Sequence, residues 1–159
     1  MQRSAEKGGL RRTAPVSELA RDVVRFRGHP MVSSLHPTTI EVTTEDHLSE
    51  NGDCIIGVGA DKGCSQLDPA VKECLRHEGS KVTLRIVVGS STFEVRATGD
   101  PALALSHPRD IVIRKSQFVS DRTLALRASA ASRDIPRGMV RLLMDPATVG
   151  SLEIAVECH

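Results

Sequence analysis

Apolar and polar residues alternate along most of the chain after residue 20, in short runs that predict β-strands. The runs cover residues 23–27, 38–43, 53–58, 81–88, 92–98, 110–116, 123–129 and 151–157. A period of two places apolar side chains on one face of a strand and polar side chains on the other, as in antiparallel sheets that cover a core. Eight such strands with short connections predict a mainly β (α+β) fold, an antiparallel β-sandwich or distorted barrel.

Two segments have helical periodicity instead. The first begins with Asp68 as N-cap and Pro69 at the first helical position, and it ends at Gly79. The second covers roughly residues 133–144, where apolar side chains recur at the spacing of a core-facing helix, and Pro146 ends it. We expect both helices to pack against the sheets.

The first two strands fit one another as an antiparallel hairpin. Pairing Phe26 with Ile40 joins apolar side chains, and the same register sets Arg25 opposite Glu41 on the outer face. One alignment therefore satisfies both faces, and we predict this hairpin.

Length and composition are those of an ordinary globular domain, with 159 residues, 40% of them hydrophobic and 26% charged. Residues 1–19 lack periodicity and predict a flexible basic arm, so that residues 20–159 form a single β-rich domain without an internal repeat. No apolar run reaches the roughly eighteen residues of a membrane helix, and the first residues do not look like a secretion signal. We expect a cytoplasmic protein that does not contact a membrane.

The cysteines form neither a CxxC pair nor a zinc-binding spacing. They are Cys54, Cys64, Cys74 and Cys158. We predict four free thiols, which agrees with a cytoplasmic setting, and no bound metal.

Charge is unevenly distributed although the net charge is only +1. The net charge is +4 over residues 1–27, −5 over residues 28–108 and +5 over residues 109–141. Basic segments can orient an anionic partner, or the acidic middle of the chain can neutralise them. With no Trp, no Tyr and three Phe, the chain has almost no aromatic side chains on which single-stranded bases could stack, which weighs against RNA binding.

The strongest candidate for a binding loop is the stretch NGDCIIGVGADKG at residues 51–63. Gly59 and Gly63 surround Asp61 and Lys62, and backbone amides freed by glycine can hold a phosphate together with a lysine. The spacing GxGxxxG matches neither the dinucleotide-binding motif nor the P-loop, and the same glycines permit a bulge and a tight turn at a barrel corner. Both interpretations remain open from sequence.

Two histidines and a basic pair complete the candidates. His29 and His36 precede prolines at strand ends, where they can act as acid and base, bind a metal or form structural hydrogen bonds; the hairpin register turns them to opposite faces, which disfavours a shared metal. Arg114 and Lys115 suit a carboxylate or phosphate ligand, or else a salt-bridged edge. No HExxH, no GxSxG and no nucleophile with an evident base is present, so catalytic residues and cofactors remain unassigned.

Several segments together resemble a known family. They are FRGHP at 26–30, HPTTIEVT at 36–43, GDCIIGVGADKG at 52–63, RKS at 114–116 and DRT at 121–123. In this order, over about residues 21–145, they resemble an archaeal family described as domain of unknown function 371. The resemblance implies a mostly β, jelly-roll-like fold and an archaeal cytosolic setting, and it brings no established activity, cofactor or partner.

From these observations we expect a small domain that binds an anionic, phosphate-bearing small molecule. The candidate binding residues are His29, His36, Gly59, Asp61, Lys62, Arg114 and Lys115. The alternatives are a nucleic-acid or ribonucleoprotein accessory module, which would use the arm and residues 109–141, and a structural partner in a complex. RNA binding should weaken steeply with salt, and binding in a pocket much less. The ligand, the reaction and the oligomeric state do not follow from the sequence.

Overall fold

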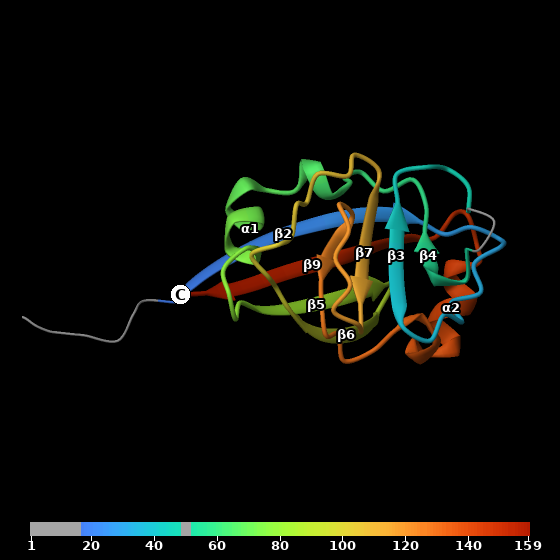
Figure 1. Cartoon of the computed structure of the whole chain (residues 1–159). Helices are drawn as coiled ribbons and strands as arrows, with labels where there is room; N and C mark the ends of the chain where they lie inside the picture. The colour runs from blue at the N-terminus through green and yellow to red at the C-terminus, as the bar shows by residue number, and fades with distance from the viewer. Residues whose placement is uncertain (1–16, 49–51) are drawn as a thin grey trace, which may run out of the picture.

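Two four-stranded sheets packed face to face make up most of the computed structural model, which describes residues 17–48 and 52–159 (Figure 1). The first sheet has the order β2 (Glu18–Arg27), β9 (Val149–Cys158), β5 (Lys81–Val88) and β6 (Ser91–Thr98). The second has the order β4 (Ile55–Gly57), β3 (Thr39–Thr43), β7 (Asp110–Arg114) and β8 (Thr123–Ala125). The predicted mainly β fold with two helices is confirmed, and the sheets do not close into a barrel.

Helices α1 (Pro69–Leu75) and α2 (Arg137–Leu143) lie at opposite ends of the domain (Figure 1). As predicted, Asp68 caps α1, and its carboxylate accepts a hydrogen bond from the Ala70 amide at 2.8 Å. Helix α2 begins later than predicted because a separate 3-10 turn and then Pro136 precede it. The 3-10 turns are η1 (Gly52–Cys54), η2 (Cys64–Gln66) and η3 (Ser132–Asp134).

The predicted hairpin of the first two strands does not form. Strand β2 pairs along its whole length with β9, so that Phe26 lies opposite Gly150. Strand β3 lies in the other sheet, antiparallel to β7 and parallel to β4. The alternation of apolar and polar residues shows which face of a strand is buried, but it does not show which other strand is its partner. The connection after β2 does not turn back to form a hairpin with β3. It runs along the end of α2, where the His29 amide donates to the Leu143 carbonyl at 2.9 Å.

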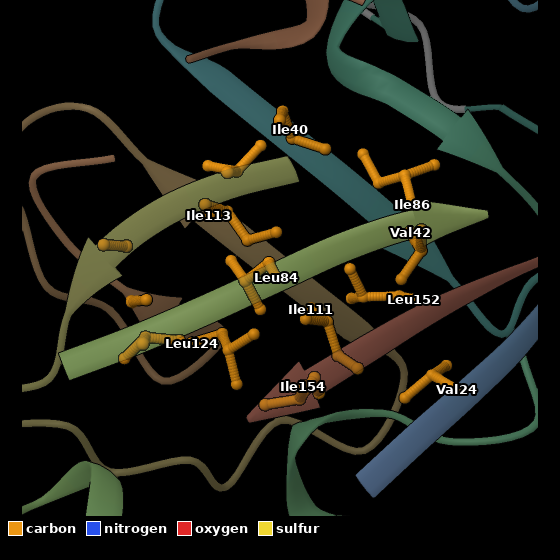
Figure 2. Packing of buried hydrophobic residues seen from close by; sticks show 14 of the residues in the cluster. Val24, Ile40, Val42, Leu84, Ile86, Ile111, Ile113, Leu124, Leu152 and Ile154 are labelled. Carbon is orange, nitrogen blue, oxygen red and sulfur yellow. The ribbon is translucent and has the colours of Figure 1, made fainter. Parts of the chain in front are cut away.

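The core lies between the inner faces of the two sheets. Figure 2 shows Val24, Leu84, Ile86, Leu152 and Ile154 of the first sheet with Ile40, Val42, Ile111, Ile113 and Leu124 of the second, each at most 2% exposed. Burying one such side chain contributes about 1.5–3 kcal/mol. Because the inner faces are apolar, polar chemistry belongs to the outer faces and to the ends of the domain.

The two halves of the chain repeat one arrangement, which the sequence analysis missed. Each half runs strand, strand, short parallel strand, helix, strand, as β2, β3, β4, α1, β5 and as β6, β7, β8, α2, β9. Arg27 and Val58 exchange two backbone hydrogen bonds. Thr98 and Leu126 do the same at the equivalent place in the second half. The halves are therefore related by a pseudo-twofold axis.

The strand register locates this axis. Glu41 is paired with Val112 in the β3–β7 ladder, and the repeat makes these two residues equivalent as well. Arg85 and Glu153 are partners and equivalents in the β5–β9 ladder. A residue that pairs across a ladder with its own equivalent in the other half must lie beside the axis. The axis therefore passes through the middle of both sheets.

A disulfide joins Cys74 of α1 to Cys158 at the end of β9, with Cα atoms 5.5 Å apart. The prediction of four free thiols was therefore wrong, because sequence spacing does not reveal that β9 runs beside α1. Only Cys54 and Cys64 are free.

The predicted N-terminal arm, residues 1–19, overlaps the first described strand. Glu18 and Leu19 already belong to β2, and residues 1–16 of the predicted arm lie outside the described residues. Within the described ranges, no helix combines the length and the apolar character needed to cross a membrane.

Candidate functional site

The glycine loop after β4 lies along the edge of β2, and its backbone amides are already hydrogen-bonded. The amides of Gly59, Ala60 and Asp61 donate to the carbonyls of Glu45, Thr43 and Arg25 at 2.7–2.9 Å. A phosphate bound here would have to replace these bonds. Gly59 has a φ of +60°, so the loop uses glycine to turn the backbone at the sheet edge.

Asp61 and Lys62 are bound within the fold. The Asp61 carboxylate accepts from the Arg25 amide at 2.9 Å, and the Lys62 ammonium pairs with Asp22. Burial acts to raise the pKa of Asp22, but the hydrogen bond from Lys62 and those from two backbone amides outweigh it and lower this pKa. Lys62 is thus neutralised by a carboxylate of the first sheet.

His29 and His36 form local structural hydrogen bonds. Their Nδ1 atoms accept from the amides two residues ahead, of Met31 at 3.0 Å and of Thr38 at 3.2 Å. At the place equivalent to His29, an aspartate forms the same turn: the Asp100 carboxylate accepts from the amide two residues ahead at 2.8 Å. These contacts correspond to the structural alternative for the two histidines.

Arg114 contributes to a polar cluster on the outer face of the second sheet. Its Nε donates to Thr123 Oγ1 at 2.9 Å, its Nη2 donates to Ser120 Oγ at 3.1 Å, and its Cζ lies 5.0 Å from the ring centroid of Phe118. Burial, and then Arg122, lower the pKa of Arg114. Its neighbour Lys115 is exposed. Apart from that neighbour, Arg114 has no contact with the other predicted candidates among the described residues.

Glu41 is the centre of this cluster and is only 6% exposed. Its carboxylate accepts from Arg122 Nη1 and from the Cys54 thiol, each at 3.4 Å. The same Arg122 Nη1 donates to Asp110 Oδ2 at 3.0 Å, and Thr43 Oγ1 donates to Asp110 Oδ1 at 2.8 Å. One guanidinium nitrogen therefore serves two carboxylates.

A cavity of about 220 Å³ opens beside these carboxylates. Its lining consists of Glu41, Thr43, Glu45, His47, Ile55, Arg109, Asp110 and Arg122. The register of β3 against β4 shifts between Glu41 and Val42, and such a bulge re-aims the side chains next to it. The bulge orients Glu41, which lies beside the pseudo-twofold axis, and the residues that follow β3 complete the wall of this polar pocket.

The fold does not require these charges. In the other half, the positions equivalent to Glu41, Arg122 and Asp110 are occupied by Val112, Cys54 and Thr39. The same backbone arrangement therefore forms with uncharged side chains. Burying charged groups costs free energy of desolvation, which uncharged residues at the same positions would avoid. A functional role therefore explains the cluster better than a role in stability does.

The electrostatics of the cluster set which groups carry charge. Burial raises the pKa of Glu41, while Arg122 opposes the rise. Burial and Glu41 raise the pKa of the Cys54 thiol to about 12, and burial raises that of Cys64 to about 12. Neither thiol is ionised near neutral pH, so neither is an activated nucleophile. Burial lowers the pKa of Arg122, but the carboxylates Glu41 and Asp110 outweigh it and raise this pKa, so Arg122 stays charged.

The raised pKa of Glu41 predicts a distinct pH dependence of stability. A carboxyl whose pKa is higher in the folded state stabilises the fold fully below its unfolded pKa, and this contribution is lost as pH rises through the folded pKa. Glu41→Gln imitates the protonated form at every pH. We therefore expect the free energy of unfolding of Glu41→Gln, relative to the wild-type protein, to rise with pH from about 4.5 upward.

Urea denaturation between pH 4 and pH 8 measures this difference. Glu78→Gln is the control for removing a carboxylate, since Glu78 is exposed and forms no ion pair among the described residues. A flat difference between Glu41→Gln and the wild-type protein would contradict the raised pKa.

Comparison with known proteins shows the family of this chain. A family model described as domain of unknown function (DUF371) matches residues 24–157. The chain belongs to the DUF371 family. An uncharacterized protein of the archaeon Methanocaldococcus jannaschii is 38% identical over 123 residues, which are 77% of this chain and 90% of that protein. The family resemblance expected from the sequence motifs is confirmed.

The DUF371 motifs meet at the polar cluster. HPTTIEVT contributes Glu41 and Thr43, GDC contributes Cys54, RKS contributes Arg114, and DRT contributes Arg122. Sequence reasoning missed Glu41, Asp110 and Arg122 as site residues, since it placed Glu41 on a solvent face opposite Arg25. The available signal was that charged residues recur inside the motifs that carry the family resemblance. In the described part of the chain, no group of three or more His, Cys, Asp or Glu side chains is placed to hold a metal ion.

Proposed function

We propose that this protein binds a small organic anion, a carboxylate or phosphate that also bears a hydroxyl or amino group, in the cavity beside Glu41. The observation that carries the proposal is the sharing of one Arg122 nitrogen by Glu41 and Asp110 at the cavity wall. This places a guanidinium and two carboxylates together where the repeated half has uncharged residues. The anionic ligand expected from the sequence is thereby assigned to a different set of residues.

The donors for the anion come from two arginines. Among the described residues, no group accepts a hydrogen bond from Arg122 Nε or Nη2, and the Arg109 guanidinium pairs only with Glu45, through Nε at 3.5 Å. A guanidinium with two N–H groups to spare matches a carboxylate or a phosphate in bidentate fashion. Glu41 and Asp110 can accept from a hydroxyl or ammonium group on the same ligand.

The size of the cavity limits the ligand. Pockets for drug-sized molecules are about 300–1,000 Å³, and this one is smaller at about 220 Å³. A metabolite of roughly ten non-hydrogen atoms is the size that fits. Neither free thiol is assigned a catalytic role, because both are protonated near neutral pH.

Backbone-amide NMR titration tests the proposal. The probes are inorganic phosphate, glycerol phosphate, acetate and glycolate, so that the anion and the hydroxyl are varied separately. We expect the hydroxylated anions to shift the amides around Glu41 and Arg122, and Arg122→Lys, which keeps the charge and loses the fork, to weaken binding about tenfold or more. Arg141→Lys on exposed α2 is the matched control and should change nothing. Equal shifts across the surface, or no shift with any probe, would reject the site.

The nucleic-acid alternative can be distinguished by salt. It would use the N-terminal arm and the basic segment 109–141, in which the Arg114 guanidinium is already hydrogen-bonded to Thr123 and Ser120. Affinity for a single-stranded RNA should fall steeply between low and physiological salt, in proportion to the number of phosphates neutralised. Affinity for a small anion in the cavity should fall much less.

A further inference from the structure

Four large apolar side chains are exposed where α2 meets the start of β9. They are Met31 (70% exposed), Leu142 (47%), Met144 (44%) and Val149 (62%), and we call them the α2-end patch. Their backbone segments are hydrogen-bonded to each other: the amides of Gly28 and His29 donate to the carbonyls of Thr148 and Leu143 at 3.0 and 2.9 Å, and Thr148 Oγ1 donates to Leu142 O at 2.6 Å. The four residues therefore come from backbone segments that are bonded to one another, at the end of the domain where α2 lies (Figure 1).

The other half of the chain provides an internal comparison for this patch. The hydrogen bonds of Gly99 and Asp100 repeat those of Gly28 and His29, and they align the two ends residue by residue. The positions equivalent to Met31, Leu142, Met144 and Val149 are Ala102, Cys74, Arg76 and Lys81. At the α1 end the fold thus uses a small residue, a disulfide-bonded cysteine and two cations. Exposed apolar side chains are not a requirement of this architecture.

The position of Leu142 shows what is missing at the α2 end. Its equivalent, Cys74, is buried and bonded to Cys158, so the end of β9 covers that part of α1. Over Leu142, no described segment provides such a cover, and Leu142 remains half exposed. Exposed apolar clusters of this kind mark sites where proteins meet.

The charge around the patch selects the partner. Residues 27–35 and 133–149 carry four basic and two acidic side chains, a net charge of +2. The equivalent residues 98–106 and 65–81 carry three basic and four acidic side chains, a net charge of −1. Pairing two α2-end patches in a symmetric dimer would bring like charges together, which costs free energy. A lipid surface is a poorer match, since the patch has no aromatic side chain and α2 spans only seven residues.

We propose that the α2-end patch is the docking surface for a different protein, which presents a segment of apolar side chains flanked by Asp and Glu. The methionines adapt to the shape of the apolar side chains, and Arg141, exposed next to Leu142, pairs with a carboxylate of the partner. This surface is separate from the cavity at Glu41, so it does not depend on the ligand proposed there.

Selection from displayed random peptides of about twelve residues tests the proposal. The full chain is the target, and the variant Met31→Ala/Leu142→Ser/Met144→Ser is used to remove peptides that bind elsewhere. The variant should fold and melt within a few degrees of the wild-type protein, because the three side chains are 44–70% exposed and lie outside the core. We expect the enriched peptides to combine two or three apolar residues with Asp or Glu. A synthetic peptide of this sequence should bind the variant at least tenfold more weakly than the wild-type protein.

Two further variants separate the alternatives. Arg141→Glu introduces the residue that the other half has at the equivalent position, Glu73, and it should weaken binding of the same peptide at least threefold. Leu19→Ser changes an exposed apolar residue at the α1 end and should leave binding of the peptide unchanged. Failure to enrich peptides, or enrichment of basic ones, would overturn the proposal. Three other results would also overturn the proposal. They are a dimer of the wild-type protein that the triple variant does not form, sedimentation of the wild-type protein but not the variant with anionic phospholipid vesicles, and a large fall in the melting temperature of the triple variant.

Discussion

Gly99→Ala and Gly28→Ala are each expected to lower the free energy of unfolding by about 3 kcal/mol or more. A Cβ at residue 99 would overlap the backbone carbonyl of Leu75, and one at residue 28 would overlap that of Leu143. These are the carbonyls of the last residues of α1 and α2, and they cannot move away because they accept hydrogen bonds from the amides of Asp100 and His29. The same close approach occurs in both halves, so both substitutions should have similar effects.

Gly138→Ala is the matched control for these substitutions. A Cβ at this position in α2 would meet nothing closer than Arg141 Nη2 at 3.8 Å. Alanine is the better helix former, so the control should gain up to about 1 kcal/mol. Urea denaturation measures all three variants. Losses below about 1 kcal/mol at both Gly28 and Gly99 would contradict the close approach of helix and strand.

Removing the disulfide with Cys74→Ala/Cys158→Ala is expected to lower the free energy of unfolding by about 3 kcal/mol, a fall in Tm of roughly 10 °C. The bond closes a loop with a sequence separation of 84 residues, and it therefore removes much of the conformational freedom of the unfolded chain. It also fixes α1 to the end of β9, the strand that the sequence analysis did not place beside this helix.

A count of reactive thiols checks the bond independently. Unfolded without reductant, the protein should expose two reactive thiols, those of Cys54 and Cys64, and after reduction it should expose four. Cys64→Ala is the control for losing a buried sulfur without losing a covalent link. Four reactive thiols before reduction would show that the disulfide is not formed.

The sequence predicted the elements well and their partners poorly. The pattern of apolar and polar residues placed the eight strands of the described residues, and the Asp68-Pro69 pair placed the start of α1, because these signals depend on neighbouring residues only. The partner of β2 is β9, more than a hundred residues later, and local alternation fits β3 as well as it fits β9. The internal repeat escaped notice because the residues that the halves share are scattered along the chain: pairs such as His36 and His107, or Leu84 and Leu152, are separated by positions that differ.

The candidate site was predictable only in part. Arg114 was named from its basic neighbourhood, and it does lie in the polar cluster. Glu41 was assigned to solvent because it faces away from the core, and no local pattern shows that later residues and Arg122 bury it there. The loop at Gly59 attracted attention for its glycines, whereas its amides donate to carbonyls of β2, of β3 and of the segment that follows β3.

The interleaving of the halves has a consequence for biosynthesis. Every ladder of the first sheet joins one half of the chain to the other, and β9, which follows the other seven described strands in the chain, fills the place between β2 and β5. Until β9 emerges from the ribosome, β2 has no partner strand and β5 has one open edge, although both strands are synthesised long before. The nascent chain must therefore keep these open edges from aggregating until β9 has been made.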